Sequence, residues 1–292
     1  MTKEKPKIIV ILGQTATGKS SLAVKIAKKV NGEIISADSR QVYKGLDLGT
    51  GKITKKEMQG IPHYLLDVVN AKSKFTVVDY KKFADKKIKE IIARGKTPII
   101  CGGTGFYIDA VIKNVIFPEV LPNEKLRKIL NKKTTEDLFE MLKKLDKRRA
   151  KNIDSKNKIR LIRAIEIVKE LGKVPSLKKK NSNYEFVKIG LFMPLELLKE
   201  KINKRLISRV ESGMLKEIQN LHKNGLSWKR MEELGLEYRY VALYLQKKIT
   251  KQEMLEKLNS EIFKYAKRQM TYFKRDPEIK WFDASKEIAF KV

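Results

Sequence analysis

Residues 7–20 read KIIVILGQTATGKS, and this stretch decides the fold class. Residues 7–12 are a continuous apolar run, typical of a strand that is buried on both faces of a parallel sheet. The loop at 13–20 fits the phosphate-binding pattern G-x-x-x-x-G-K-[ST]. An amphipathic helix is expected over 20–30, because one helical face carries Leu22, Ala23, Ile26, Ala27 and Val30. Strand, loop and helix in this order form the context in which the pattern marks a phosphate site.

The loop would offer several kinds of phosphate ligand together. Its glycines let the backbone curl so that the N–H groups point inward, and the helix N-terminus adds partial positive charge. Lys19 supplies a full charge, and the Ser20 hydroxyl is a ligand for Mg²⁺. The residues expected to bind a diphosphate or triphosphate are Gly13, Thr15, Ala16, Thr17, Gly18, Lys19 and Ser20. The alternative is a glycine-rich turn that only links strand and helix.

Further strands and helices alternate along the first third of the chain. A second and a third strand are expected at 32–38 and 97–101, with a helix at 76–94 between them, which favours a parallel α/β sheet. The alternation stops at 117–185, where the pattern is charged and helical without a good strand. Lys178, Lys179 and Lys180 look like a flexible linker. The later elements are expected at 186–193 (strand), 195–223 and 251–274 (helices) and 280–283 (strand).

This pattern predicts two parts. Residues 1–116 and 186–292 would form the α/β core, and residues 117–185 a small helical lobe inserted into it. The lobe is strongly basic, since residues 121–185 hold 20 Lys and Arg against 9 Asp and Glu. The whole chain of 292 residues carries a net charge of +31. A polyanion is therefore the expected partner, with nucleic acid first and a membrane surface second. The alternative is a lysine-biased composition without such a partner.

Composition excludes several classes of protein. Apolar residues make up 42% of the chain, which argues against general disorder. No run of about 18 uncharged apolar residues exists, so no transmembrane helix is expected. The chain has 1 cysteine, Cys101, which can form neither an internal disulfide nor a structural zinc site. A single thiol suits a reducing cytoplasm. Nothing indicates an obligate assembly, so a monomer is expected.

Three motifs follow one another along the chain: GQTATGKS at 13–20, DSRQVYKGLDLGTGK at 38–52 and GGTGFY at 102–107. Together they resemble the tRNA dimethylallyltransferase family, also called tRNA isopentenyltransferase. RLIRAIE at 160–166 and AKRQMTYF at 266–273 resemble later family motifs, so the resemblance covers nearly the whole chain. Three departures are Gln14, where the family usually has proline, Arg40-Gln41, where many members have apolar or Met-Gln residues, and LGLEYR ending at Arg239, where many members have I-G-Y-(K/R) or V-G-Y-R. None removes a charged or hydroxyl group that we would assign to chemistry.

The resemblance implies a fold and a reaction. The fold would be a P-loop kinase-like parallel sheet core with an inserted all-helical lobe that grips the tRNA anticodon stem-loop. The reaction would move a dimethylallyl group from dimethylallyl diphosphate to N6 of the adenosine 3′-adjacent to the anticodon, with Mg²⁺ as cofactor. Asp38 would be the general base, while Lys19 and Arg239 would neutralise the diphosphate. Thr104 would shape the channel that receives the adenine.

The resemblance also implies tRNA contacts, and each assignment has an alternative. The expected tRNA-binding residues are Asp38, Ser39, Arg40, Gln41, Thr104, Arg160, Arg163 and Arg239. Asp38 could instead cap a turn, and the arginines could pair with nearby carboxylates. Three other functions stay open: a P-loop small-molecule or nucleoside kinase, a prenyltransferase acting on free AMP or ADP, and a nucleic-acid-binding protein without catalysis. The basic insertion disfavours the first two, and the phosphate loop disfavours the third.

Overall fold

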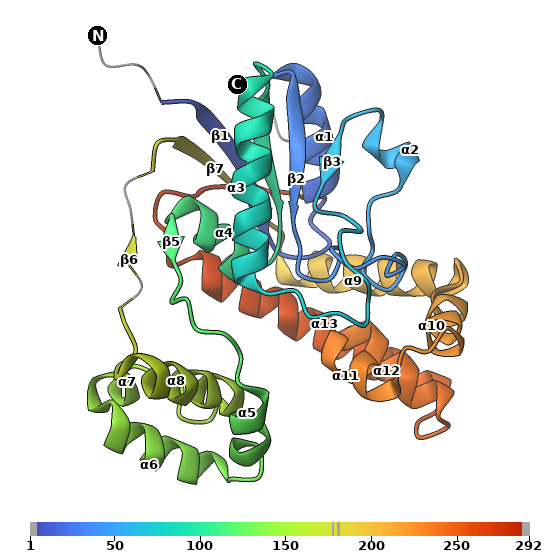
Figure 1. The fold of residues 1–292 in the computed structure, drawn as a ribbon. Coiled ribbons are helices and arrows are strands. Elements are labelled where there is room, and N and C mark those ends of the chain that lie inside the picture. The colour runs from blue at the N-terminus through green and yellow to red at the C-terminus, as the bar shows by residue number, and fades with distance from the viewer. Residues whose placement is uncertain (1–4, 177, 180–181, 288–292) are drawn as a thin grey trace. The chain divides into compact units, whose positions relative to one another are not determined.

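The computed structural model describes residues 5–176, 178–179 and 182–287. The chain divides into two compact units, one formed by Met1–Lys113 with Asn181–Val292 and the other by Asn114–Lys180. The second unit overlaps the inserted lobe that the sequence predicts at 117–185, but its bounds are Asn114 and Lys180. Figure 1 shows both units coloured along the chain.

The first unit is built on a parallel sheet. In the described part of the chain its strand order is β3-β2-β4-β1-β7-β8, and every pairing is parallel. The fold class predicted from the sequence, an α/β protein with a parallel sheet core, is therefore confirmed. The strands are β1 (Lys7–Gly13), β2 (Gly32–Ala37), β3 (His63–Tyr64), β4 (Thr97–Gly102), β7 (Glu185–Phe192) and β8 (Lys280–Asp283).

Helices cover both faces of this sheet, as the continuous apolar strands require. One face packs on α1 (Lys19–Lys29), through a cluster that includes Ile11, Ile26 and Ile99. The other face packs on α3 (Val77–Ala93) and α4 (Gly105–Ile112), through a cluster that includes Val10 and Ile88. In Figure 1, α3 lies in front of the sheet and α1 behind it.

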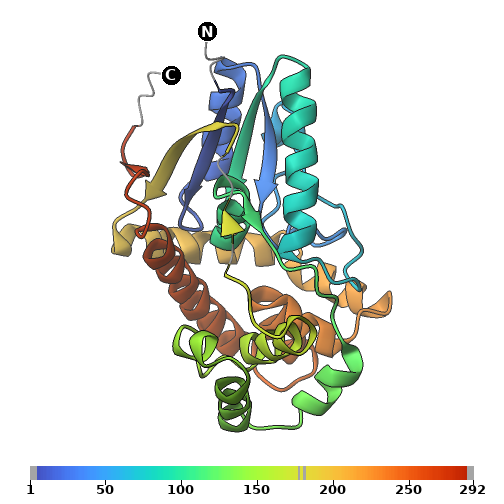
Figure 2. The same ribbon diagram turned by 60° about the vertical axis from the view of Figure 1, so that its left-hand side comes forward.

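A helical layer lies beyond the carboxyl ends of the strands. The arrowheads of the strands point towards α9 and α13 in Figure 2. The helices of this part are α9 (Leu195–Glu211), α10 (Met214–Lys223), α11 (Trp228–Leu234), α12 (Leu236–Leu245) and α13 (Lys251–Phe273), and the short α2 (Lys55–Met58) precedes β3.

The sequence predicts one helix over 195–223, and this is wrong. Gly213 has a φ of +104° and separates α9 from α10, because a left-handed residue cannot continue a right-handed helix.

The second unit has its own small core, in which Leu138, Leu142, Leu161 and Ile165 are fully buried. Its elements are β5 (Val115–Ile116), α5 (Glu124–Leu130), α6 (Thr135–Leu145), α7 (Lys147–Lys151), α8 (Lys158–Leu171) and β6 (Lys178–Lys179). The prediction of a stretch without strands is wrong at residues 178–179. These pair antiparallel with Val115 and Ile116, where backbone hydrogen bonding overrides a lysine run that has poor strand propensity.

No helix in the described part of the chain combines the length and the apolar character that crossing a bilayer would require.

Candidate active site

The phosphate loop joins β1 to α1 at the carboxyl edge of the sheet. Gly13 ends β1 with a φ of +133°, and a Cβ on it would lie 2.1 Å from the carbonyl oxygen of Leu191 in β7. Only glycine fits such an approach. Gly18 has a φ of +83° and directly precedes α1, which begins at Lys19. The backbone thus takes the curled path that the sequence pattern predicts, with Lys19 and Ser20 in the first turn of a helix.

Gln14, the departure from the usual proline, anchors this loop. Its side chain is buried, and its Oε1 accepts a hydrogen bond from the backbone N–H of Met193 at 3.3 Å. Its own backbone N–H donates to Leu191 O at 3.4 Å, a bond that proline could not make. Its carbonyl oxygen accepts bonds from Thr17 Oγ1 at 2.8 Å and Lys19 Nζ at 2.5 Å. The substitution therefore ties the loop more firmly to the end of β7.

Gln269 of α13 bridges the phosphate loop and the end of β4. Its Oε1 accepts a hydrogen bond from the N–H of Thr15 at 2.8 Å, and its Nε2 donates to Gly103 O at 2.9 Å. The residue is 6% exposed. The Thr15 amide, predicted to face a phosphate, is thus occupied by a side chain. Sequence reasoning quoted Gln269 within AKRQMTYF but gave it no role, because its partners lie 254 and 166 residues away along the chain.

Asp38 and Thr104 meet at the next two strand ends. The Thr104 hydroxyl accepts a hydrogen bond from the N–H of Ser39 at 3.0 Å, and the Thr104 N–H donates to Ala37 O at 3.1 Å. A Cβ on Gly102 would lie 2.3 Å from Ala37 O, so the glycine permits this contact between β2 and β4. Because β2 and β4 are neighbours in the sheet, the structure brings Asp38 and Thr104 together.

One oxygen of Asp38 is bound, and the other has no partner among the residues that the structure describes. Oδ1 accepts hydrogen bonds from the N–H groups of Arg40 at 2.8 Å and Gln41 at 3.3 Å. Asp38 therefore caps this turn, which the sequence analysis gave as the alternative to a catalytic role. Within the described residues Oδ2 has no hydrogen-bond or ion-pair partner, and the residue is half-buried. The two amides fix the orientation of the carboxylate and leave one oxygen available to a ligand.

The segment after Asp38 is fixed by helices of the same unit. Arg40 Nη2 donates to Glu233 O at 3.3 Å, and Gln41 Nε2 donates to Gly51 O at 3.4 Å. Ser39 is half-buried, and its amide is already bound to Thr104. Of the predicted tRNA-binding residues in this segment, Arg40 and Gln41 therefore have structural partners.

Glu217 of α10 holds the loop that follows. Its Oε2 accepts hydrogen bonds from the N–H of Leu48 at 2.6 Å and of Asp47 at 3.2 Å, and its Oε1 from the N–H of Gly49 at 3.1 Å. The hydroxyl of Tyr238 donates to Oε1 at 3.0 Å. Three backbone donors are satisfied by one carboxylate, so Glu217 orders residues 47–49. Sequence reasoning missed it, since a lone glutamate on a helix carries no signal of such a partner.

Burial is the main influence on the charge of Lys19. Burial lowers the pKa of its ammonium to about 8, and nearby Arg205 lowers the pKa further, while Cys101 and Asp38 oppose the change. In the described part of the chain its only hydrogen bond goes to Gln14 O, and no carboxylate pairs with it. Burial also raises the pKa of Cys101 to about 12, so that thiol is neutral. Among the described residues, the loop lysine is therefore a cation without an ion-pair partner.

Arg239, which the resemblance places at the diphosphate, has a different partner in the structure. It lies on α12, is exposed, and its Nη2 donates to Glu232 O at 3.2 Å. Glu261 is a carboxylate whose lowered pKa reflects mainly Lys264 and to a smaller degree Arg239. The described side-chain hydrogen bond of Arg239 is thus with α11, and no described contact joins Arg239 to the phosphate loop.

The two arginines predicted to bind tRNA in the second unit differ from each other. Arg163 Nη1 pairs with Glu166 at 3.2 Å, and its Nη2 donates to Val120 O at 2.8 Å. Glu166 is buried and also binds Arg127 at 2.6 Å. Arg160 is exposed, and its side chain makes no hydrogen bond or ion pair within the described residues. Arg163 is therefore part of the internal packing of this unit, whereas Arg160 is unpaired.

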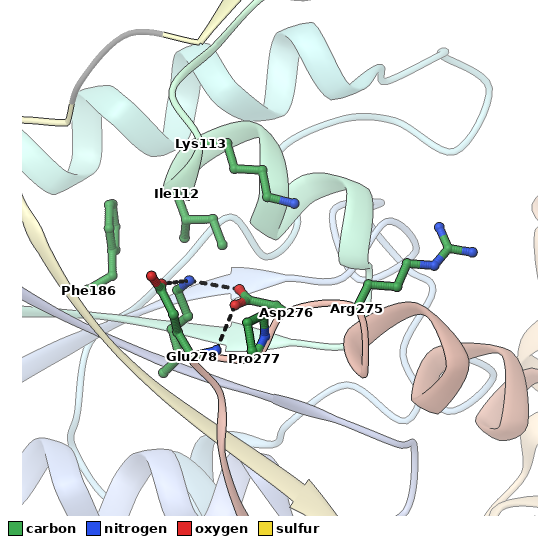
Figure 3. A pocket seen from close by; sticks show the side chains of 8 residues that line it. Ile112, Lys113, Phe186, Arg275, Asp276, Pro277 and Glu278 are labelled. Carbon is green, nitrogen blue, oxygen red and sulfur yellow. Dashed lines mark hydrogen bonds and ion pairs between the residues drawn. The ribbon is translucent and has the colours of Figure 1, made fainter. Parts of the chain in front are cut away.

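A cavity of about 450 Å³ lies elsewhere in the first unit (Figure 3). Lys188 on its wall is neutralised by Asp276 at 2.7 Å and Glu278 at 2.6 Å. Phe186, also on its wall, pairs with Ile8, five positions before Gly13 in β1, which is about 16 Å along the strand. The cavity is thus separate from the phosphate loop, and of the predicted site residues none lines it. The lining residues are Ile112, Lys113, Phe186, Lys188, Arg275, Asp276, Pro277 and Glu278.

Replacing Gln269 should loosen the phosphate loop. We expect Gln269→Ala to lower the free energy of unfolding by about 2–3 kcal/mol, because it leaves the buried Gly103 O and the partly buried Thr15 N–H without this partner. We also expect the Thr15 amide to exchange its hydrogen much faster, measured by NMR. Gln252→Ala, on the exposed start of the same helix, is the matched control and should change neither quantity. Unchanged protection of Thr15 in Gln269→Ala would contradict the bridging role.

Comparison with known proteins gives one consistent family. A sequence profile of the IPP transferase family matches residues 41–276. The chain is 40% identical to the tRNA dimethylallyltransferase of Carboxydothermus hydrogenoformans, over 98% of this chain and 94% of that protein. It is 43% identical to tRNA dimethylallyltransferase 2 of Treponema denticola, over 93% of each chain.

Solved structures agree. The full-length tRNA isopentenylpyrophosphate transferase of Bacillus halodurans superposes with a TM-score of 0.73 at 35% identity, covering 96% of this chain and 90% of that one. A eukaryotic dimethylallyltransferase, solved acting on tRNA, gives a TM-score of 0.81 at 27% identity, covering 96% and 74%. With a profile match over most of its length and relatives near 40% identity across nearly all of it, the chain belongs to the IPP transferase family.

Proposed function

We propose that this protein is a tRNA dimethylallyltransferase. It transfers the dimethylallyl group of dimethylallyl diphosphate to N6 of the adenosine 3′-adjacent to the anticodon and releases diphosphate. The observation that carries the proposal is the junction of three strand ends, where the half-free carboxylate of Asp38 and the hydroxyl of Thr104 lie beside a phosphate loop. Family membership supports the choice of this reaction over the others that such a loop could serve.

The phosphate loop binds the diphosphate. The N-terminus of α1, with the ammonium of Lys19, provides positive charge where the leaving group gains negative charge. Ser20 is exposed in the first turn, which suits a hydroxyl that shares Mg²⁺ with phosphate oxygens and water, as this ion prefers. When bound through Ser20, Mg²⁺ would neutralise diphosphate charge. The loop amide of Thr15 is held by Gln269, which leaves the remaining loop amides as donors.

Asp38 receives the proton. The N6 lone pair of adenine is delocalised and weakly nucleophilic, so a base that accepts an N6–H hydrogen bond assists attack. As the bond from N6 to C1 of the dimethylallyl group forms, the bond from C1 to the bridging oxygen breaks and its electron pair leaves with the diphosphate. The N6 proton passes to Oδ2 of Asp38, while Oδ1 stays bound to the amides of Arg40 and Gln41.

The adenine must leave the stacked anticodon loop to reach this carboxylate, as in other enzymes that modify bases. Thr104 lies next to Asp38, and Gly103 and Gly105 leave no room for side chains, since a Cβ on either would collide with Gln269 or Tyr272 at 2.2 and 2.4 Å. We infer that Thr104 and the segment 38–41 line the entry for the base. Arg239 remains a candidate for tRNA or diphosphate contact.

The second unit binds tRNA through phosphate contacts, which position the RNA without reading its sequence. Arg160 supports this role because its guanidinium is exposed and unpaired among the described residues. Burial lowers the pKa of the neighbouring Arg149, and Arg160 and Arg148 lower it further, while Asp146 opposes this effect. A monomeric state and a cytoplasmic location remain predictions.

A transfer assay tests the proposal. The protein is mixed with Mg²⁺, labelled dimethylallyl diphosphate and unmodified tRNA, and the label in RNA is measured beside a tube that holds AMP. We expect label in tRNA, and a kcat about 10²–10⁴-fold lower for Asp38→Asn, which removes the base but keeps the acceptor for both amides. Asp85→Asn on α3 is the matched control and should retain full activity.

Each other outcome assigns a different function. Label in AMP alone would replace the proposal with a prenyltransferase acting on free nucleotides. No label in either tube, together with ATP consumption in a screen of small molecules, would replace it with a kinase. Full activity of Asp38→Asn would leave the reaction in place and reject Asp38 as its base.

The lowered pKa of Lys19 predicts a pH dependence of binding. The diphosphate binds the charged ammonium, which predominates below a pKa of about 8 in the free protein. Affinity for dimethylallyl diphosphate should therefore fall about tenfold per pH unit as pH rises above 8, since only the protonated fraction binds well. In Lys19→Arg, whose guanidinium stays charged, affinity should be constant between pH 7 and 9.5. Isothermal titration calorimetry would measure both, and parallel slopes would reject this role of Lys19.

The two arginines of the second unit should separate binding from stability. We expect Arg160→Ala to weaken tRNA binding roughly fivefold to tenfold and to reduce the slope of log K against log salt by about 1, with unfolding unchanged. Arg163→Ala should instead lower the free energy of unfolding by about 1–2 kcal/mol, because Glu166 loses a hydrogen-bonded partner. Filter binding at several salt concentrations and thermal unfolding would distinguish them. Equal salt slopes in wild type and Arg160→Ala would contradict the phosphate contact.

A further inference from the structure

Tyr272, near the end of α13, packs against the start of α4. A Cβ on Gly105, the first residue of α4, would lie 2.4 Å from both Cδ1 and Cε1 of Tyr272, so one edge of the ring rests directly on the glycine backbone. The Tyr272 hydroxyl donates to Oδ2 of Asp109 at 2.7 Å. Asp109 lies four residues after Gly105, and residues at this spacing share one helical face. The ring therefore lies along the first turn of α4 and contacts it at two points.

Two cations fix the orientation of this ring. Lys113 Nζ pairs with the same Oδ2 atom of Asp109 at 2.7 Å. The guanidinium of Arg275 lies over the Tyr272 ring, 5.5 Å from its centroid. A hydroxyl that donates to a carboxylate makes a stronger hydrogen bond than two neutral groups make. The placement of Tyr272 on α4 thus rests on directional contacts as well as on packing.

Thr104, the residue directly before Gly105, moves with this first turn. Its carbonyl oxygen accepts a hydrogen bond from the N–H of Ile108 at 3.2 Å. It is the N-cap of α4, yet its side chain makes no capping hydrogen bond. The Thr104 hydroxyl oxygen instead accepts from the N–H of Ser39 at 3.0 Å, next to Asp38. A shift of the first turn of α4 would therefore change the distance between Thr104 and the segment that carries Asp38.

Helix α13 contacts the chain on both sides of Thr104. Gln269 lies three residues before Tyr272, on the same side of the helix, and donates to Gly103 O at 2.9 Å. Tyr272 contacts Gly105 on the other side of Thr104. One helix thus holds the residues before and after Thr104, while the hydroxyl of Thr104 is bound to the segment after β2.

We propose that Tyr272 is a positioning residue for the transfer reaction. Its ring sets the first turn of α4, and this turn holds the Thr104 hydroxyl beside Asp38. This inference rests on the proposed function. The adenine N6 must lie within hydrogen-bond reach of the Asp38 carboxylate, and a misplacement of about 1 Å can lower a rate about 10²-fold. Because Tyr272 acts on α4, its loss should lower kcat and leave the affinity for diphosphate unchanged.

The test compares Tyr272→Ala and Tyr272→Phe with a matched control, Tyr64→Phe. The Tyr64 hydroxyl also donates to a carboxylate, that of Glu33 at 2.8 Å, and Lys87 lies over the Tyr64 ring at 4.9 Å. Glu33 lies in β2 five residues before Asp38, which is about 16 Å along the strand. The control therefore removes a similar hydrogen bond at a distance from the site.

Transfer to tRNA and binding of inorganic diphosphate with Mg²⁺ are measured for each variant. We expect kcat to fall about 10- to 100-fold in Tyr272→Ala and about twofold to fivefold in Tyr272→Phe, which keeps the ring on Gly105. Tyr64→Phe should keep the wild-type kcat. All three variants should bind diphosphate as the wild type does, which also shows that they fold. If Tyr272→Ala loses diphosphate binding, Tyr272→Phe decides by the same criteria.

Hydrogen exchange of the Ser39 amide, measured by NMR, reports the position of Thr104 without any substrate. We expect this amide to exchange faster in Tyr272→Ala than in the wild type, with Tyr272→Phe between them and Tyr64→Phe unchanged. A wild-type kcat in Tyr272→Ala, or unchanged exchange of Ser39, would overturn the proposal. Equal losses of kcat in Tyr272→Phe and Tyr64→Phe would also overturn it, because the effect would then be one of general stability.

Failure of this inference and failure of the proposed function give different results. If the wild type transfers label to tRNA and Tyr272→Ala does so at the same rate, the function stands and Tyr272 is rejected. If the wild type transfers no label but Ser39 exchanges faster in Tyr272→Ala, Tyr272 still positions Thr104 and the reaction must be reassigned.

Discussion

The site depends on how closely the backbones of neighbouring strands approach at their carboxyl ends. A Cβ on Gly13 would lie 2.1 Å from Leu191 O, and one on Gly102 would lie 2.3 Å from Ala37 O. These glycines let β1 meet β7 and β4 meet β2 without an intervening side chain. Because the phosphate loop, Asp38 and Thr104 each follow one of these strand ends directly, the same contacts determine the spacing of the chemical groups.

Side chains from the C-terminal helices then complete what the strand ends begin. Gln269 takes an amide of the phosphate loop and a carbonyl beyond β4, while Glu217 takes the amides at 47–49. Each replaces water at backbone groups that would otherwise be buried and unsatisfied. Residues that are distant in the chain therefore contribute to one loop geometry. The site cannot be complete before α10 and α13 are packed, and this couples its order to the fold of the whole first unit.

The contrast between groups in local motifs and side chains that act over long sequence separations explains what the sequence could predict. The phosphate loop, Asp38 and Thr104 belong to short motifs at strand ends, so the alternation of strands and helices was enough to bring them to one edge. Gln269 and Glu217 act on partners more than 150 residues away, and no local pattern encodes such a pairing. The predictions of a single helix over 195–223 and of no strand at 178–179 were wrong for a related reason. A single left-handed residue and a backbone ladder outweighed the helical period and the lysine run.

The positions of the carboxylates determine which of the described cations are paired within the protein. Asp276 and Glu278 neutralise Lys188, Glu166 binds Arg163, and Glu237 binds Arg209. These are the cations that packing takes partly out of water, where an unpaired charge costs most. Lys19, Arg205 and Arg160 are left without such partners within the described residues, although two of them lie where protein atoms already lower the pKa. In a chain of net charge +31, these carboxylates stabilise the fold, and the proposed diphosphate and tRNA contacts would supply negative charge to Lys19 and Arg160.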